Sequence, residues 1–171
     1  MSVSAQDLVS FLRGLRAAKD YTSEPVDQQA LESILEVGRW SASGSNRQST
    51  EVVVIKDSEL KQKMVGWGAR PAGTAAVVLL LVVQDDGSAL DEGRMAERLC
   101  LGASAVGLGS TVATLKNEGP DEIKKALGIP AEHRARTIVS IGHADRSAAK
   151  QPARSPGGRK PLSEYAHYDR F

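Results

Sequence analysis

The sequence contains one cysteine, Cys100, few aromatic residues and almost no net charge. A single thiol excludes an internal disulfide and fits a reducing compartment, so we expect a cytoplasmic protein. Aromatic residues make up 4% of the chain, which leaves no stacking platform for single-stranded nucleic acid. A formal net charge of +1 gives no broad attraction to nucleic acid or to an anionic membrane surface.

Long hydrophobic stretches are also missing. The longest apolar run, residues 75–83, is far too short for a membrane helix and is typical of a strand buried on both faces. The N-terminus shows no pattern of a signal peptide. A length of 171 residues, 41% of them hydrophobic, predicts a single domain over residues 1–171, with residues 143–171 as an extended C-terminal arm.

The usual catalytic patterns are absent from the sequence. It has no phosphate-binding loop ending in Gly-Lys-Ser/Thr, and the glycines of residues 102–110 lack the Rossmann spacing. His133, His143 and His167 lie on unrelated segments, so we predict no metal site. Ser43 has no nearby histidine to activate it as a nucleophile.

Hydrophobic periodicity predicts alternating helices and strands. Helices are expected over residues 5–16, 27–40, 58–65, 91–106 and 121–127, and strands over residues 52–56, 76–84, 111–115 and 136–141. Ser4 and Ser58 are expected to cap the first and third helices. Met95, Ala96, Leu99, Cys100, Ala103 and Val106 would line one face of the longest helix, so Cys100 is expected to pack in the core. Interleaved elements of both kinds indicate a mixed α and β protein.

Residues 41–48, SASGSNRQ, form a small and polar connection between an apolar helix and a β-branched strand. A plain surface loop is one interpretation. The other is a shell of hydrogen bonds around a ligand, in which Gly44 would adopt a positive φ and allow close approach. In that case the amides of Asn46 and Gln48 would read the mixed donor and acceptor edge of a heterocycle.

Basic residues elsewhere in the chain could add phosphate-binding groups to the amides of this connection. Arg16 and Lys19 follow the first helix, and Arg159 lies near the C-terminus. Arginine and lysine bind phosphates. Together with the amides, these side chains suit a nucleotide-like cofactor such as FMN.

The C-terminal arm, residues 143–171, is rich in proline and glycine yet ends in Tyr165, Tyr168 and Phe171. Proline- and glycine-rich basic stretches are often disordered. Disordered tails seldom concentrate aromatic residues, so we expect this end to dock on its own domain or on a partner subunit.

Several motifs resemble those of the nitroreductase-like FMN-dependent oxidoreductases. RAAKDY at residues 16–21 is similar to a basic segment that ends the family's first helix, and SASGSNRQST at residues 41–50 is similar to its Ala-Pro-Ser-Gly-Gly-Asn-Arg-Gln-Pro-Trp loop. The long helix ending in GLGS, the LGIP turn, the VSIGHAD strand and the ending GGRKPLSEYAHYDRF follow in the family's order. The resemblance therefore covers nearly the whole chain.

This resemblance implies a fold, an assembly and a set of site residues. The fold would be α+β, a three-layer arrangement of a central, mostly antiparallel sheet flanked by helices, with a C-terminal tail wrapping a partner subunit. FMN would lie at the interface of a homodimer, with Ser43, Gly44 and Asn46 reaching it from the other subunit. The cofactor-binding residues implied are Arg16, Ala17, Lys19, Ser43, Gly44, Asn46, Gln48, Thr114, Leu115 and Arg159.

The resemblance also implies an activity. The expected protein is an FMN-dependent NAD(P)H oxidoreductase that reduces nitroaromatic, quinone or related small acceptors by ping-pong hydride transfer, with NADH or NADPH as co-substrate. The flavin would carry the chemistry, so no side chain is assigned as catalytic. Ala42 replaces the family's proline and Ser49–Thr50 replaces Pro-Trp, which favours an alternative, a non-catalytic flavin-binding or storage protein. A third interpretation is a plain α/β interaction module with a basic tail.

Overall fold

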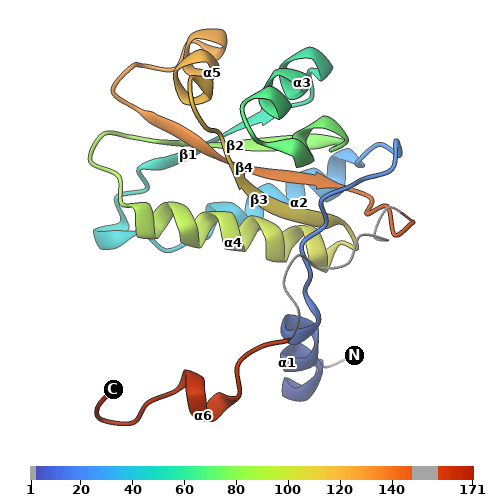
Figure 1. Cartoon of the computed structure of the whole chain (residues 1–171), viewed down its shortest axis with the longest axis vertical. Coiled ribbons are helices and arrows are strands. Elements are labelled where there is room, and N and C mark those ends of the chain that lie inside the picture. Colours follow the sequence, from blue (N-terminus) through green and yellow to red (C-terminus); the bar gives the residue numbers. More distant parts are fainter. Residues whose placement is uncertain (1–2, 148–157) are drawn as a thin grey trace.

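The structure is a computed structural model that describes residues 3–147 and 158–171. Its helices are α1 (Ala5–Gly14), α2 (Gln28–Arg39), α3 (Ser58–Gly66), α4 (Ala89–Ala105), α5 (Gly119–Leu127) and α6 (Leu162–Tyr165), with short 3₁₀ turns η1 (Gly44–Asn46) and η2 (Arg70–Gly73). Its strands are β1 (Thr50–Ile55), β2 (Val77–Val83), β3 (Gly109–Thr114) and β4 (Arg134–Gly142). Each element that the periodicity predicts is present, with ends shifted by a few residues (Figure 1).

The strands form one antiparallel sheet in the order β1-β2-β4-β3. Leu80 of β2 sits at its centre, paired with Val53 of β1 on one side and with Ile138 of β4 on the other. Every residue of β2 is buried, as the apolar run predicts. The expected α+β class with a central antiparallel sheet is confirmed.

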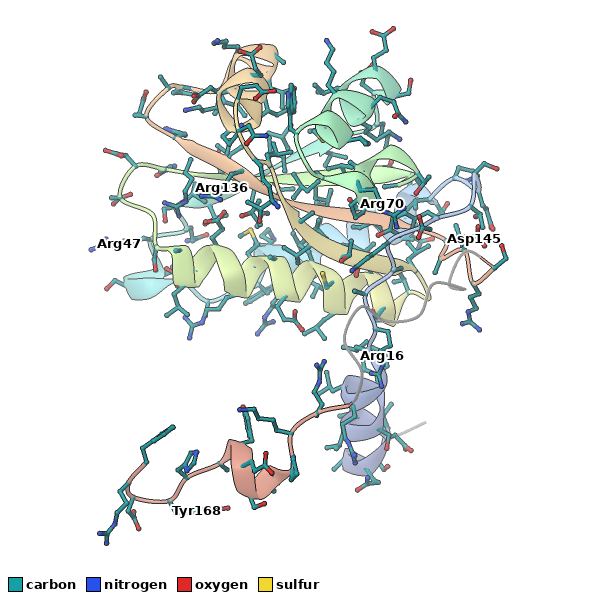
Figure 2. All side chains as sticks on the ribbon, viewed as in Figure 1. Arg16, Arg47, Arg70, Arg136, Asp145 and Tyr168 are labelled. Atoms are coloured by element: carbon teal, nitrogen blue, oxygen red, sulfur yellow. The ribbon has the colours of Figure 1, made fainter. Side chains whose placement is uncertain are left out.

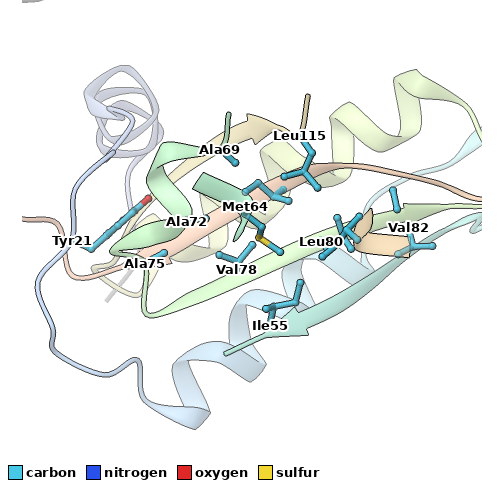
Figure 3. Close-up of a cluster of buried hydrophobic side chains, with 13 residues drawn as sticks. Tyr21, Ile55, Met64, Ala69, Ala72, Ala75, Val78, Leu80, Val82 and Leu115 are labelled. Atoms are coloured by element: carbon cyan, nitrogen blue, oxygen red, sulfur yellow. The ribbon is translucent and has the colours of Figure 1, made fainter. Parts of the chain in front are cut away.

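Helices cover both faces of the sheet, which gives the three expected layers (Figure 1). The alternation of β2 separates two apolar clusters, because successive side chains point to opposite faces of a strand. Val78, Leu80 and Val82 join the cluster under α3 and α5, which also contains Met64 and Leu115 (Figure 3). Val77, Leu79 and Leu81 join the cluster under α2 and α4.

The helix starts follow from short polar side chains that satisfy free backbone N–H groups. Ser4 caps α1 as expected: its hydroxyl accepts from the Asp7 N–H at 3.1 Å, and the Asp7 carboxylate accepts from the Ser4 N–H at 3.2 Å. The expectation that Ser58 caps α3 is wrong. Asp57 is the cap, because its backbone is extended and its carboxylate accepts from the Leu60 N–H at 2.7 Å.

Helices α2 and α4 pack closely through a glycine. A Cβ atom at Gly38 would lie 2.5 Å from Cδ2 of Leu99, which is fully buried. Cys100, one residue further on, is partly buried against the same apolar cluster, and burial raises the pKa of its thiol. Val106 does not join the buried face as expected, because α4 ends before it and it is 40% exposed.

Helix α1 and the C-terminal segment stand away from the rest of the molecule (Figure 1). Every residue of α1 is exposed in the described chain, including Leu8, Phe11 and Leu12. Tyr165, Tyr168 and Phe171 are exposed as well. Residues 148–157 of the expected arm lie outside the described residues. Docking of the arm on its own domain or on a partner subunit stays a prediction. Within the described ranges, no helix is long and apolar enough to cross a membrane.

Candidate functional site

The segment that follows α1 is fixed to the sheet by Tyr21. This side chain is 5% exposed, and its hydroxyl donates to the carbonyl oxygens of Ala18 at 2.6 Å and of Ser140 at 3.0 Å. The Ala18 N–H donates to the Ser110 carbonyl oxygen at 2.9 Å, at the start of β3. Residues 16–19, here called the basic segment, therefore run across one end of the sheet.

The side chains of the basic segment that the sequence analysis selects all face outward. Arg16, Ala17 and Lys19 are exposed. Arg16 Nη1 donates to the carbonyl oxygens of Arg13 at 2.9 Å and Leu15 at 2.7 Å, which satisfies groups left unpaired at the end of α1. The Lys19 ammonium and the remaining guanidinium donors lie at the surface, where they can meet an anion.

Residues 43–48, here called the 43–48 loop, fold on themselves. The Ser43 hydroxyl accepts from the Gln48 N–H at 3.0 Å, and its carbonyl oxygen accepts from the Asn46 N–H at 3.0 Å. The Gln48 side-chain amide lies 3.5 Å from the Asn46 carbonyl oxygen. Gly44, Asn46 and Gln48 are exposed. The loop therefore presents amide groups to the surface from a shape that it maintains by itself.

The backbone of this loop has positive φ angles, but at other residues than the sequence predicts. Positive φ angles occur at Ser45 (51°), Asn46 (54°) and Gln48 (53°). The expectation of a positive φ at Gly44 is wrong, because the turn reverses one residue later. Each non-glycine residue in this left-handed region costs about 1–2 kcal/mol, with asparagine the most tolerant. Such strain occurs often at ligand-binding loops.

Asp91, which the sequence analysis missed, ties this loop to the body of the protein. It lies in the first turn of α4 and is 7% exposed. Its Oδ2 accepts from the Gly44 N–H at 2.9 Å, and its Oδ1 lies 3.5 Å from Nη1 of Arg94. In the sequence, an acid in a first helical turn is explained by the helix dipole alone, and nothing there links it to a loop 47 residues earlier.

The basic segment and the 43–48 loop lie at opposite ends of α4. Gly44 contacts Asp91 in the first turn, whereas Ala18 contacts Ser110, beyond the last turn. Helix α4 has 17 residues and is therefore about 25 Å long. Arg16 and Arg47 accordingly lie on different sides of the molecule (Figure 2). A single chain does not bring these two groups of predicted site residues together.

The remaining predicted residues lie on other segments of the chain. Thr114 ends β3 and is partly buried. Leu115 is fully buried, and its N–H donates to the Arg136 carbonyl oxygen at 2.8 Å. Arg159 is exposed just before α6. Their roles toward a cofactor stay predictions.

A surface groove elsewhere is lined in part by Lys61, which bonds to the backbone. It has a volume of about 380 Å³ and lies between residues 22–26, residues 73–77, Lys56 and Lys61. Lys61 Nζ donates to the carbonyl oxygens of Ala75 at 2.7 Å and Ala76 at 3.3 Å, and burial lowers the pKa of this lysine. Across residues 3–147 and 158–171, no group of three or more His, Cys, Asp or Glu side chains is arranged to hold a metal.

Comparison with known proteins shows what the chain is similar to. The model of the nitroreductase family matches residues 12–70, which include the basic segment and the 43–48 loop. A solved structure of an FMN-dependent nitroreductase from Clostridium difficile R20291 superposes with a TM-score of 0.80, at 21% identity, over 95% of this chain and 99% of that chain. The predicted resemblance to the nitroreductase family is confirmed.

Two curated relatives agree with the nitroreductase resemblance. An FMN reductase [NAD(P)H] from Bacillus subtilis (strain 168) is 27% identical, and the match covers 84% of this chain and 69% of the relative. An NADPH-flavin oxidoreductase from Vibrio harveyi is 23% identical, with 80% of this chain and 65% of the relative covered. The chain thus spans roughly two thirds of each relative's length.

The groups available in this nitroreductase-like chain fit FMN chemically. The basic segment supplies exposed cations of the kind that bind a phosphate. The 43–48 loop supplies exposed amides, whose donors and acceptors match a polyol chain and a heterocyclic edge. Hydrogen bonds from the Gln48 and Asn46 N–H groups to Ser43 hold the loop in its folded shape, which lowers the entropy lost on binding.

Proposed function

We propose that this chain is an FMN-dependent NAD(P)H oxidoreductase that reduces nitroaromatic, quinone or related small acceptors. The names of the two curated relatives support the cofactor and the co-substrate. The observation that carries the proposal is the 43–48 loop, which keeps three residues at positive φ and presents exposed amides within the stretch that the family model matches.

The proposed binding roles divide between the two groups of residues. Arg16, Ala17 and Lys19 contact the phosphate, the ribityl chain or the pyrimidine edge of the ring, and Arg159 binds the phosphate. Ser43, Gly44 and Asn46 hold the ribityl chain and the ring, and Gln48 supports that loop. Thr114 and Leu115 place backbone groups beside the reactive edge.

The separation of these groups supports a homodimer. Because the basic segment and the 43–48 loop lie at opposite ends of α4, one cofactor can meet both only if the second group comes from another copy. Helix α1 offers an exposed apolar surface to such a copy, with Leu8 and Leu12 more than half exposed. Exposed aromatic residues at the C-terminus add to that surface.

The protein's share of the chemistry is binding, orientation and electrostatics. FMN, when bound, would supply the redox chemistry between NAD(P)H and the acceptor. Arg16 or Lys19 near the pyrimidine edge would stabilise negative charge there. NAD(P)H would leave before the acceptor binds at the same face, which gives ping-pong kinetics. The lone thiol of Cys100 is compatible with the cytoplasm as the site of this reaction.

A second candidate function is non-catalytic flavin binding or storage. One observation favours it: Ser49–Thr50 replaces the Pro-Trp pair of the resembled loop motif.

The visible absorption spectrum of the purified protein tests both candidates. We expect the two bands of an oxidised flavin, with about one FMN per chain released on heating. Steady-state oxidation of NADH or NADPH then separates the two functions, because a storage protein would hold FMN and show no turnover with any acceptor. A colourless protein that takes up no added FMN would overturn both.

A further inference from the structure

Few contacts connect the 43–48 loop to the rest of the described chain. One is the hydrogen bond from the Gly44 N–H to Oδ2 of Asp91, at 2.9 Å. Another is the ion pair between Arg47 and Asp86, at 3.8 Å, whose side chains are 61% and 68% exposed. Exposed ion pairs at that distance contribute little. Beside the loop, the Gln84 N–H donates to the Ser49 carbonyl oxygen at 2.8 Å. Within residues 43–48, the Asp91 hydrogen bond is the stronger of these two contacts to the body of the protein.

Asp91 is itself held firmly. It lies in the first turn of α4 and its side chain is 9% exposed. Helix α4 packs against α2 and contributes Ala96, Leu99 and Ala103 to the buried cluster beneath it. A carboxylate on such a rigid element gives a fixed reference point, and its hydrogen bond to a backbone N–H is stronger than one between neutral groups.

The loop needs such a reference point because its conformation is strained. Ser45, Asn46 and Gln48 all have positive φ angles, and residues of this kind persist only where the surrounding structure over-determines them. The hydrogen bonds of Ser43 close the loop on itself but do not set its place on the domain. Asp91 supplies that placement at Gly44, where the 3₁₀ turn begins.

We propose that Asp91 is a positioning residue, which holds the 43–48 loop in the shape and place that FMN binding requires. The proposal rests on the proposed function for its cofactor. It assigns no contact with the cofactor to Asp91. The carboxylate acts through Gly44, and its loss would let the strained backbone relax before a ligand arrives.

The neighbouring residue Glu92 provides a matched control. It is also a buried acid in the same helical turn, at 6% exposure, but its partner is Arg134. A general structural role for buried acids at the start of α4 predicts similar effects at both positions. A positioning role predicts an effect on the loop for Asp91 alone.

The experiment compares Asp91→Ala, Asp91→Asn and Glu92→Gln in the full-length protein. FMN affinity is measured by titrating the apoprotein and following flavin fluorescence. Amide hydrogen exchange at residues 43–48 is measured by NMR in the apoprotein, without any flavin. Asp91→Ala should weaken FMN binding about tenfold, the loss expected for one charge-assisted hydrogen bond, and should accelerate exchange at Gly44. Asp91→Asn keeps an acceptor oxygen, so it should restore most of both properties.

Other results would overturn the proposal. Equal FMN affinity in Asp91→Ala and the wild type would do so, as would equal losses in Asp91→Ala and Glu92→Gln. If the wild type binds no FMN, the proposed function fails together with the cofactor role. In that case the exchange rate at Gly44 still decides whether Asp91 fixes the loop. An unchanged rate in Asp91→Ala would show that Asp91 does not hold the loop in place.

Discussion

Arg134 in β4 donates two hydrogen bonds to Oε2 of Glu92 in α4, from Nε at 3.1 Å and from Nη2 at 3.0 Å. The Glu92 side chain is 8% exposed and that of Arg134 is 36% exposed. The other oxygen, Oε1, is buried and has no hydrogen-bond partner among the described residues. Arg134 is therefore the hydrogen-bond partner of this buried carboxylate, and the pair links α4 to β4.

Removing the arginine should destabilise the protein more than neutralising the acid. Arg134→Ala leaves a buried carboxylate unpaired and should lower the free energy of unfolding by about 2–3 kcal/mol. Glu92→Gln keeps an acceptor for Arg134 and should lower it by about 1 kcal/mol. Urea unfolding followed by circular dichroism measures both. Equal losses in the two variants would contradict this account of the pair.

The contact between Gly38 and Leu99 predicts that the effect of Gly38→Ala on the free energy of unfolding changes sign when Leu99 is shortened. A Cβ at Gly38 would lie 2.5 Å from Cδ2 and 3.1 Å from Cγ of Leu99. Gly38→Ala alone should therefore destabilise the protein by about 1–2 kcal/mol through overpacking, despite the higher helix propensity of alanine. Leu99→Ala alone should lower the free energy of unfolding by about 3 kcal/mol.

In the Leu99→Ala background, Gly38→Ala should instead stabilise the protein, by about 1 kcal/mol. The clash is then gone, and the propensity gain and partial filling of the cavity remain. Thermal and urea unfolding of the four proteins gives the coupling energy. Strict additivity would show that the two helices adjust without strain and that this glycine is not needed for their close packing.

The regular elements were predictable because local pattern and tertiary burial agree in them. The run from Ala75 to Val83 is apolar throughout, and β2 is buried on both faces. The helical spacing of Leu31 and Ile34 matches the buried side of α2. The cap at Asp57 was missed by one residue because Asp57 and Ser58 are both good capping residues.

The candidate site was less predictable, for reasons of geometry. The composition of residues 41–48 indicates a special loop but does not say which residues have a positive φ. Glycine is the commonest residue in that conformation, yet here Ser45, Asn46 and Gln48 adopt it. The role of Asp91 depends on a contact with Gly44, far away in the sequence. The length of α4 separates the two groups of site residues, and no local pattern reveals this.

Gly44 offers a direct test of close cofactor approach. A Cβ there would lie 3.8 Å from Oδ2 of Asp91, an ordinary van der Waals distance, and φ is not positive. Gly44→Ala should therefore leave the unfolding midpoint within about 1 °C. If FMN packs against this backbone, the same variant should bind it at least about tenfold more weakly. Unchanged affinity would place the cofactor away from Gly44.

Glu36 is expected to titrate at unusually low pH. Hydrogen bonds from Arg39, and then from the indole of Trp40, lower the pKa of this exposed carboxyl from 4.5 to about 2. Because the folded-state pKa is depressed, its stabilising contribution is present above the unfolded-state pKa of 4.5 and is lost as the pH falls through about 2. NMR titration should show the pKa rising toward 4.5 in Arg39→Ala and rising less in Trp40→Phe. A wild-type pKa near 4.5 would mean that these bonds do not persist in solution.

Helix α1 exposes two leucines that the proposed homodimer should need. Leu8 and Leu12 are 52% and 53% exposed although they lie one turn apart on a well-capped helix, and the proposed homodimer would bury them. Leu8→Glu combined with Leu12→Glu should shift the protein from twice the chain mass to the chain mass in light scattering, because charged side chains cannot enter an apolar interface.

FMN should be lost in the same step, since in the proposed homodimer one cofactor meets the basic segment of one copy and the 43–48 loop of the other. Lys63→Glu changes charge on an exposed part of α3 and serves as the control, which should remain dimeric and retain FMN. A double variant that becomes monomeric and still binds FMN would show that one chain forms the site alone. In that case α1 and the basic segment would have to move toward the 43–48 loop of the same chain. The hydrogen bond from the Tyr21 hydroxyl to the Ser140 carbonyl oxygen opposes such a movement.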